Sequence, residues 1–171
     1  MSDDGLSVAS PSRRRMTSSE LAVWRMLIDT TTELGRILGA QLVRESDLSP
    51  ADYHVLLALS EAAGRRLRSS ELAATIGWER SRLSHHLRRM ERRGLIRRRD
   101  CATDSRGSEV FLTDDGARMF SGATAPHMRA IKRHFADALT PEQFAALADV
   151  LRTLQRHLHP EPTTPAEVTR P

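Results

Sequence analysis

Residues 81–96 of the chain are Ser-Arg-Leu-Ser-His-His-Leu-Arg-Arg-Met-Glu-Arg-Arg-Gly-Leu-Ile. At about 100° per residue, Leu83, Leu87 and Met90 fall on one narrow face of a helix, which suits that face to packing against a neighbouring helix. The opposite arc has no apolar member, and its side chains are basic or able to form hydrogen bonds. We therefore predict an amphipathic helix from Glu79 to Arg93 with a polar, positively charged outer face.

A second, shorter helix is predicted just before this one. The segment Ser69-Ser70-Glu71-Leu72-Ala73 opens a helix that ends near Ile76. Gly77 follows, and glycine is the residue most often found where a helix ends in a left-handed turn. A helix, a short turn and a second helix form a helix-turn-helix pattern, which is common in DNA-binding proteins but has many false positives when taken alone.

Two short strands are predicted after the second of these helices, at residues 95–99 and 109–112. The polar segment between them contains Asp104 and Arg106, which makes the pair a candidate wing. Arg106 would reach an adjacent minor groove of DNA, and Asp104 would orient its guanidinium. The alternative is a surface ion pair in a turn, which contributes little.

Longer helices are predicted on both sides of this region from capping signals at their first turns. At three positions a residue with a hydroxyl group is followed, three residues later, by a side chain that can accept a hydrogen bond from its backbone N–H. The pairs are Thr17 with Glu20, Ser49 with Asp52, and Thr140 with Gln143. Apolar residues at helical spacing then give helices over 17–43, from 49 onward, and over 141–158. Thr113 caps a further helix over 114–139, with a possible kink at Pro126.

The predicted fold class follows from this order of elements. It is mostly α with a small β wing: a winged helix-turn-helix with additional N- and C-terminal helices. Residues 17–158 form the predicted folded part of the chain. Residues 1–16 and 159–171 lack periodic apolar residues, so disordered tails are expected there.

The positive charge is concentrated around the predicted helix-turn-helix. Residues 65–99 hold twelve arginines and three glutamates, whereas the whole chain of 171 residues has a net charge of only +4. A solvated helix face is the usual explanation of a lone basic helix, but so large a local excess favours a polyanion such as duplex DNA. The predicted DNA contacts are Ser81, Arg82, Ser84, His85, His86, Arg88, Arg89, Asp104 and Arg106.

Several other classes of protein are disfavoured by the sequence. The chain has no Gly-rich phosphate loop and no strand-turn-helix nucleophile motif, so we expect no enzymatic activity. The histidines are scattered and Cys101 is the single cysteine, so neither a metal site, a cofactor nor a disulfide is expected. A redox-active Cys101 is the alternative to an inert thiol. No apolar run approaches the ~20 residues of a membrane span, and a cytoplasmic protein without membrane contact is expected.

The segment from Leu48 to Gly116 resembles the MarR family of bacterial regulators. The matching pieces are Leu-Ser-Pro-Ala-Asp-Tyr at 48–53, Ser-Glu-Leu-Ala at 70–73, the segment 82–96, Asp-Ser-Arg-Gly at 104–107 and Leu-Thr-Asp-Asp-Gly at 112–116. The resemblance implies dimerisation helices at 17–48 and 114–158 around a winged helix-turn-helix at 49–113. It further implies a homodimer on a pseudo-palindromic operator, and repression relieved by a small phenolic or other anionic effector.

The resemblance also indicates where an effector would bind. Candidate residues are Trp24, Arg25, Tyr53 and His54, although packing in a core is the simpler role for Trp24 and Tyr53. We therefore expect a sequence-specific, ligand-responsive repressor of transcription. The alternatives are a non-specific architectural DNA-binding protein without effector response, and a winged-helix interaction module that does not bind DNA.

Overall fold

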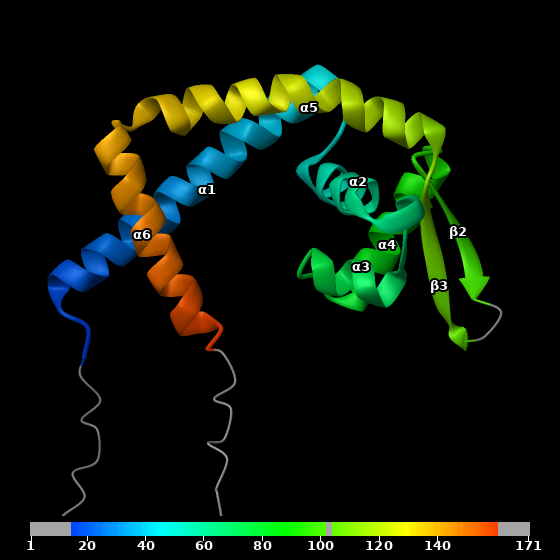
Figure 1. Ribbon diagram of the computed structural model, residues 1–171, viewed down its shortest axis with the longest axis horizontal. Helices are drawn as coiled ribbons and strands as arrows, with labels where there is room; N and C mark the ends of the chain where they lie inside the picture. Colours follow the sequence, from blue (N-terminus) through cyan, green and yellow to red (C-terminus); the bar gives the residue numbers. More distant parts are fainter. Residues whose placement is uncertain (1–14, 102–103, 161–171) are drawn as a thin grey trace, which may run out of the picture. The chain divides into compact units, whose positions relative to one another are not determined.

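The computed structural model describes residues 15–101 and 104–160, with side chains for all of these except residues 100–107 (Figure 1). The predicted disordered tails, 1–16 and 159–171, therefore lie almost entirely outside the described residues. The chain divides into two units, residues 1–37 and 38–171.

The described part of the chain is mostly helical with a small antiparallel sheet, which confirms the predicted fold class. In chain order the elements are α1 (Ser18–Ser46), α2 (Pro50–Glu61), the 3-10 turn η1 (Ala63–Arg65), β1 (Arg66–Arg68), α3 (Ser69–Thr75), α4 (Arg80–Arg92), β2 (Ile96–Cys101), β3 (Asp104–Leu112), α5 (Asp114–His134), the 3-10 turn η2 (Ala136–Ala138) and α6 (Pro141–Leu158).

The sheet has three strands in the order β1-β3-β2, and both pairings are antiparallel. The strands β2 and β3 form the hairpin of the wing (Figure 1). Strand β1 was not predicted, because its three residues Arg-Leu-Arg are too short to show an alternating pattern. Its central Leu67 pairs with Val110, so β1 adds a third strand to the base of the wing.

The predicted helix starts are present as hydrogen-bonded caps. Ser49 Oγ accepts from the backbone N of Asp52 at 3.1 Å, while the Asp52 carboxylate accepts from the backbone N of Ser49 at 2.9 Å. The same reciprocal pair forms between Thr140 and Gln143. Thr113 Oγ1 accepts from the backbone N of Gly116 at 3.0 Å. Each cap satisfies backbone donors that the first turn of a helix leaves free.

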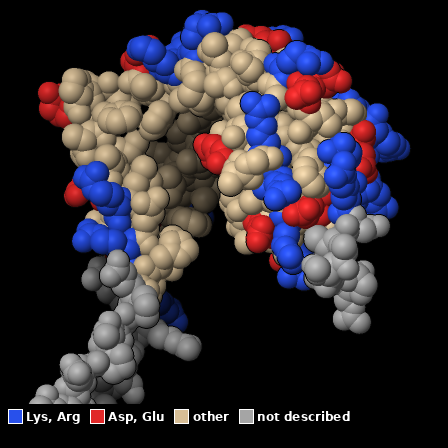
Figure 2. All heavy atoms as spheres, turned by 45° about the vertical axis from the view of Figure 1, so that its right-hand side comes forward, with Lys and Arg blue, Asp and Glu red and all other residues tan. Residues whose placement is uncertain are grey.

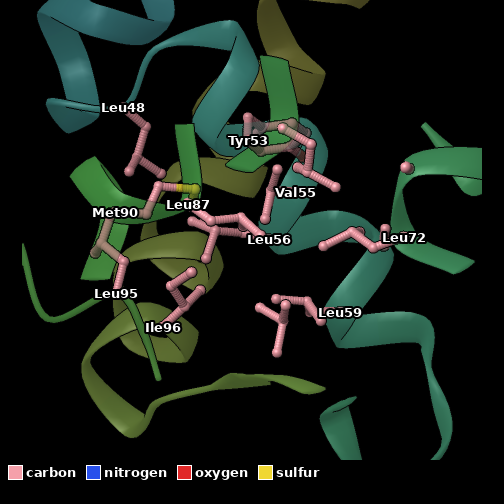
Figure 3. Close-up of a cluster of buried hydrophobic side chains, with 14 of the residues drawn as sticks. Leu48, Tyr53, Val55, Leu56, Leu59, Leu72, Leu87, Met90, Leu95 and Ile96 are labelled. Atoms are coloured by element: carbon pink, nitrogen blue, oxygen red, sulfur yellow. The ribbon is translucent and has the colours of Figure 1, made fainter. Parts of the chain in front are cut away.

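The winged-helix lobe, residues 50–112, encloses the main hydrophobic core. Helices α2, α3 and α4 contact one another or the sheet, and Figure 3 shows their apolar side chains converging. The largest fully buried side chains are Leu48, Val55, Leu56, Leu59, Leu72, Leu83, Leu87, Met90, Leu95, Ile96 and Val110. This core fixes α4 relative to α2, α3 and the wing, so the outer face of α4 is held on a rigid support.

The long helices differ from the prediction in their ends. Helix α1 extends to Ser46, three residues beyond the predicted end. Helix α5 continues through Pro126 and ends at His134, before the predicted residue 139, and η2 follows it. None of the helices in the described part of the chain has an apolar stretch long enough to cross a bilayer.

Candidate nucleic-acid interface

Helix α4 divides into a buried face and an exposed face, as its sequence predicts. Leu83, Leu87 and Met90 are at most 1 % exposed and pack into the core. Helix α4 starts soon after α3, because Gly77 adopts a φ of +67° that a residue with a side chain rarely adopts. The predicted helix-turn-helix is therefore present.

The outward face of α4 carries most of the predicted DNA-contacting side chains. Ser84 is half-buried, and the exposed members are Ser81, Arg82, His85, Arg88 and Arg89. Arg92 is also exposed and lines a shallow hollow with His85, Arg88 and Arg89. Figure 2 shows basic side chains spread over the winged-helix lobe with acidic ones between them. Such a surface can take up phosphates and the acceptor edges of bases.

His86 does not belong to this exposed face. It is 5 % exposed and lies against Asp52 of α2, which is 3 % exposed. Counting about 100° per residue puts position 86 beside Leu83 and Met90 rather than beside His85. The predicted direct DNA contact by His86 is therefore wrong, because its ring is covered by the core of the lobe.

Asp52 is the centre of a polar network. The sequence predicted this residue only as the capping partner of Ser49. One of its oxygens, Oδ2, accepts from Ser49 Oγ at 2.8 Å and from Arg93 NH1 at 2.9 Å. The other, Oδ1, lies 3.0 Å from His86 Nε2, which is ion-pair distance although the ring N–H does not point straight at the oxygen.

The network changes the acidity of Asp52. Burial alone would raise the pKa of this carboxyl group, but the contacts with His86 and Ser49 and the charge of Arg93 outweigh it. They hold the pKa of Asp52 well below its ordinary value, so Asp52 is a carboxylate. Its negative charge compensates the guanidinium of Arg93, whose side chain is partly exposed at the surface of the lobe.

The basic cluster is only partly available to a polyanion. Besides Arg93, Arg98 is engaged: its Nε donates to Glu91 Oε2 at 2.8 Å, and its backbone N donates to Glu91 Oε1 at 2.9 Å. Arg97 and Arg99 lie over the ring of Phe111, each 5.4 Å from its centroid. The pattern of charge along the sequence could not show which arginines have such partners.

An aromatic side chain at the turn before α4 was also missed. Trp78 lies under the guanidinium of Arg82 at 4.3 Å from the ring centroid, a cation–π arrangement. The Trp78 ring meets the His86 ring edge to face, with centroids 5.4 Å apart. Trp78 therefore supports both an exposed and a buried side chain of α4.

The wing is present, but its predicted contact side chains are not described. Asp104 and Arg106 lie in β3, and their side chains are outside the described residues. The same holds for the thiol of Cys101 at the end of β2. At its base the wing is tied to the start of α3, where Ser69 Oγ donates to the backbone O of Ser108 at 2.9 Å.

The four predicted effector residues are divided between the two units of the chain. Trp24 and Arg25 belong to residues 1–37, where Trp24 is 52 % exposed, so the core-packing role expected for it is wrong in the single chain. Tyr53 is buried, as expected, and packs against Phe120 and His127 with centroid distances of 5.1 and 4.7 Å. His54 is exposed. Burial and the nearby His54 lower the pKa of His127 from its ordinary value.

Residues 46–107 match the model of the MarR family. The chain is similar to Sco3205, a MarR family transcriptional regulator from Streptomyces coelicolor solved in complex with DNA, at 37 % identity over 90 % of this chain and 94 % of that one, with a TM-score of 0.79. It is similar to AbsC from the same organism, also a MarR family transcriptional regulator, at 34 % identity over 85 % and 97 % of the two chains, with a TM-score of 0.76. A more distant neighbour is the organohalide-sensing regulator RdhR in its 2,4-dichlorophenol-bound form, at 22 % identity over 88 % and 87 %, with a TM-score of 0.72.

Proposed function

The chain belongs to the MarR family of DNA-binding transcription regulators, and from this premise we propose that it is a repressor that acts as a homodimer on a pseudo-palindromic operator. The observation that carries the proposal is the exposed, basic arc of α4, held on a rigid core in a chain that resembles a regulator solved on DNA. An architectural protein would use the same charge, but it would not need the varied hydrogen-bonding groups of this helix.

In this proposal α4 enters the major groove and contacts base edges. Arg88 and Arg89 present forked donors suited to guanine, and His85 and Ser81 reach neighbouring bases or phosphates. Arg82 is pre-oriented by Trp78 for a phosphate. The wing adds Arg106 in the adjacent minor groove, with Asp104 orienting it.

The replacement Arg88→Ala is expected to weaken binding to the chain's preferred duplex by about 1–3 kcal/mol and to relax its sequence preference, because one base-contacting fork is lost. The preferred duplex is first selected from a random pool with the full chain, and affinities are then measured by fluorescence anisotropy at fixed salt. Arg129→Ala, an exposed arginine on α5, is the control and should leave the affinity unchanged. Selection of no sequence at all, with a steep salt dependence, would favour the architectural alternative.

The homodimer is supported by exposed apolar side chains on α1 and α6. Exposed large apolar residues on the two helices are Leu21, Val23, Trp24, Met26, Leu27, Ile28, Val43, Phe144, Val150, Leu151, Leu154 and Leu158. Exposed large apolar side chains that gather on a helix indicate that the helix packs against a partner. We assign these faces to a second copy, with dimerisation segments 17–48 and 114–158.

The double replacement of Leu151 and Leu154 by glutamate is expected to convert a dimer into monomers, because it buries two charges in the proposed interface. Sedimentation velocity measures the change directly, and operator affinity should fall with it. Arg156→Glu is the control, since Arg156 is exposed on the opposite side of α6. A wild-type chain that sediments as a monomer at micromolar concentration would contradict the proposal.

A small phenolic or other anionic effector completes the proposal. RdhR, which shares the fold, was solved with a chlorinated phenol, and such a ligand suits a site with an aromatic ring and a cation. Trp24, Arg25, Tyr53 and His54 are the proposed ligand-binding residues. If Arg25→Ala leaves both the affinity for a phenolic acid and its release of the operator unchanged, Arg25 has no such role.

A further inference from the structure

The buried ring of His86 lies between a carboxylate on α2 and an exposed arginine on α4. Its Nε2 is 3.0 Å from Asp52 Oδ1, and its Nδ1 is 2.8 Å from Arg89 NH2. His86 and Asp52 are both more than nine-tenths buried, whereas Arg89 is exposed on the face proposed for DNA. The three side chains therefore connect the core of the lobe to its surface.

The chemistry of Arg89 fixes the proton on the imidazole. A guanidinium has only donors, so His86 Nδ1 must accept and cannot carry a proton while this contact exists. The ring proton then lies on Nε2, the nitrogen that faces the carboxylate of Asp52. Asp52 is a fixed partner, because Ser49 and Arg93 occupy its other oxygen.

We propose that His86 is a positioning residue that sets the direction of the Arg89 guanidinium and so determines which base pair Arg89 contacts. This inference rests on the proposed function of α4 as the helix that contacts bases. His86 does not touch DNA itself. It holds one terminal nitrogen of the Arg89 guanidinium against the lobe. The other N–H donors of the guanidinium can then point in only one direction in the groove.

The test compares base preferences of the full chain and its variants in a random duplex pool. His86→Leu removes the acceptor and should lose about tenfold or more of the preference at one base pair in each half-site, as Arg89→Ala should. The double variant should lose no more than either single one. His86→Asn, which keeps an oxygen near the position of Nδ1, should retain the preference.

A measurement on the wild-type chain guards against variants that fail to fold. The ¹⁵N chemical shifts of His86 should identify the form protonated on Nε2 at neutral pH; a proton on Nδ1 would overturn the proposal. A His86→Leu chain that lowers affinity equally for all sequences, or keeps the wild-type preference, would also overturn it. If the wild-type chain selects no sequence, or Arg88→Ala leaves binding unchanged, the proposed function itself fails, which is a different result.

Discussion

Replacing Gly116 with alanine is expected to destabilise the fold by about 3–5 kcal/mol, because the new methyl group would collide with backbone atoms. An added Cβ would overlap the carbonyl O of Leu95 and lie 3.0 Å from Leu112 Cδ1. No change of rotamer relieves a clash with backbone. The first turn of α5 would have to separate from the start of β2, and Thr113 Oγ1, which donates to the carbonyl O of Leu95 at 2.9 Å, would lose its partner.

Urea denaturation followed by far-UV circular dichroism measures this effect. Gly122→Ala is the matched control, because Gly122 lies in the same helix and an added Cβ would meet nothing within 4 Å. Its expected effect is a stabilisation of roughly 0.5–1 kcal/mol, the usual difference between alanine and glycine inside a helix. Equal urea midpoints for Gly116→Ala and the wild type would show that the approach of α5 to β2 is not as close as described.

Replacing Asp52 with alanine is expected to cost about 3 kcal/mol at neutral pH, near the lower end for breaking a buried ion pair. The variant leaves the buried ring of His86 without its carboxylate and removes one of the two hydrogen bonds that cap α2, the one that the carboxylate accepts from the backbone N of Ser49. Arg93 is 37 % exposed on its side chain and can still be hydrated, which limits the loss. Asp149→Asn on α6 is the control, since its exposed pair with Arg152 should contribute less than about 0.5 kcal/mol.

The same carboxylate predicts how stability depends on pH. The pKa of Asp52 is lower in the folded chain than in the unfolded chain. At pH values between these two pKa values, the folded chain therefore binds fewer protons than the unfolded chain. Its contribution is therefore fully present above about pH 4 and is lost progressively as the pH falls further. Asp52→Asn should flatten this part of the stability profile. An unchanged slope below pH 4 would contradict the assigned network.

The sequence predicts those features that depend on neighbouring residues. The spacing of Leu83, Leu87 and Met90 gives the buried face of α4, and the pairs Ser49–Asp52 and Thr140–Gln143 give two helix starts. Features that depend on distant partners were missed. Strand β1 forms because Leu67 meets Val110, and a three-residue strand has no periodicity of its own.

The candidate site shows the same division. The exposure of Arg82, His85 and Arg88 follows from helical geometry alone. Helical geometry also puts His86 beside the buried Leu83 and Met90, but it does not predict the partner of its ring, the carboxylate of Asp52, which lies 34 positions earlier. A local charge count treats Arg93 and Arg98 like the arginines on the outward face of α4, because the contacts with their acidic partners form only when α4 packs against α2 and β2.

The contact between Glu91 and Arg98 has a mechanical consequence. It joins β2 to the last turns of α4 through hydrogen bonds. A hydrogen bond between the hydroxyl groups of Ser69 and Ser108 joins the other strand of the wing, β3, to α3. Helix α4 and the wing are therefore tied to each other and to α3, and we expect them to move as one rigid unit. In the proposed repressor, a signal that weakens DNA binding would have to reorient this unit as a whole, so it would act on the segments that connect the unit to the rest of the chain.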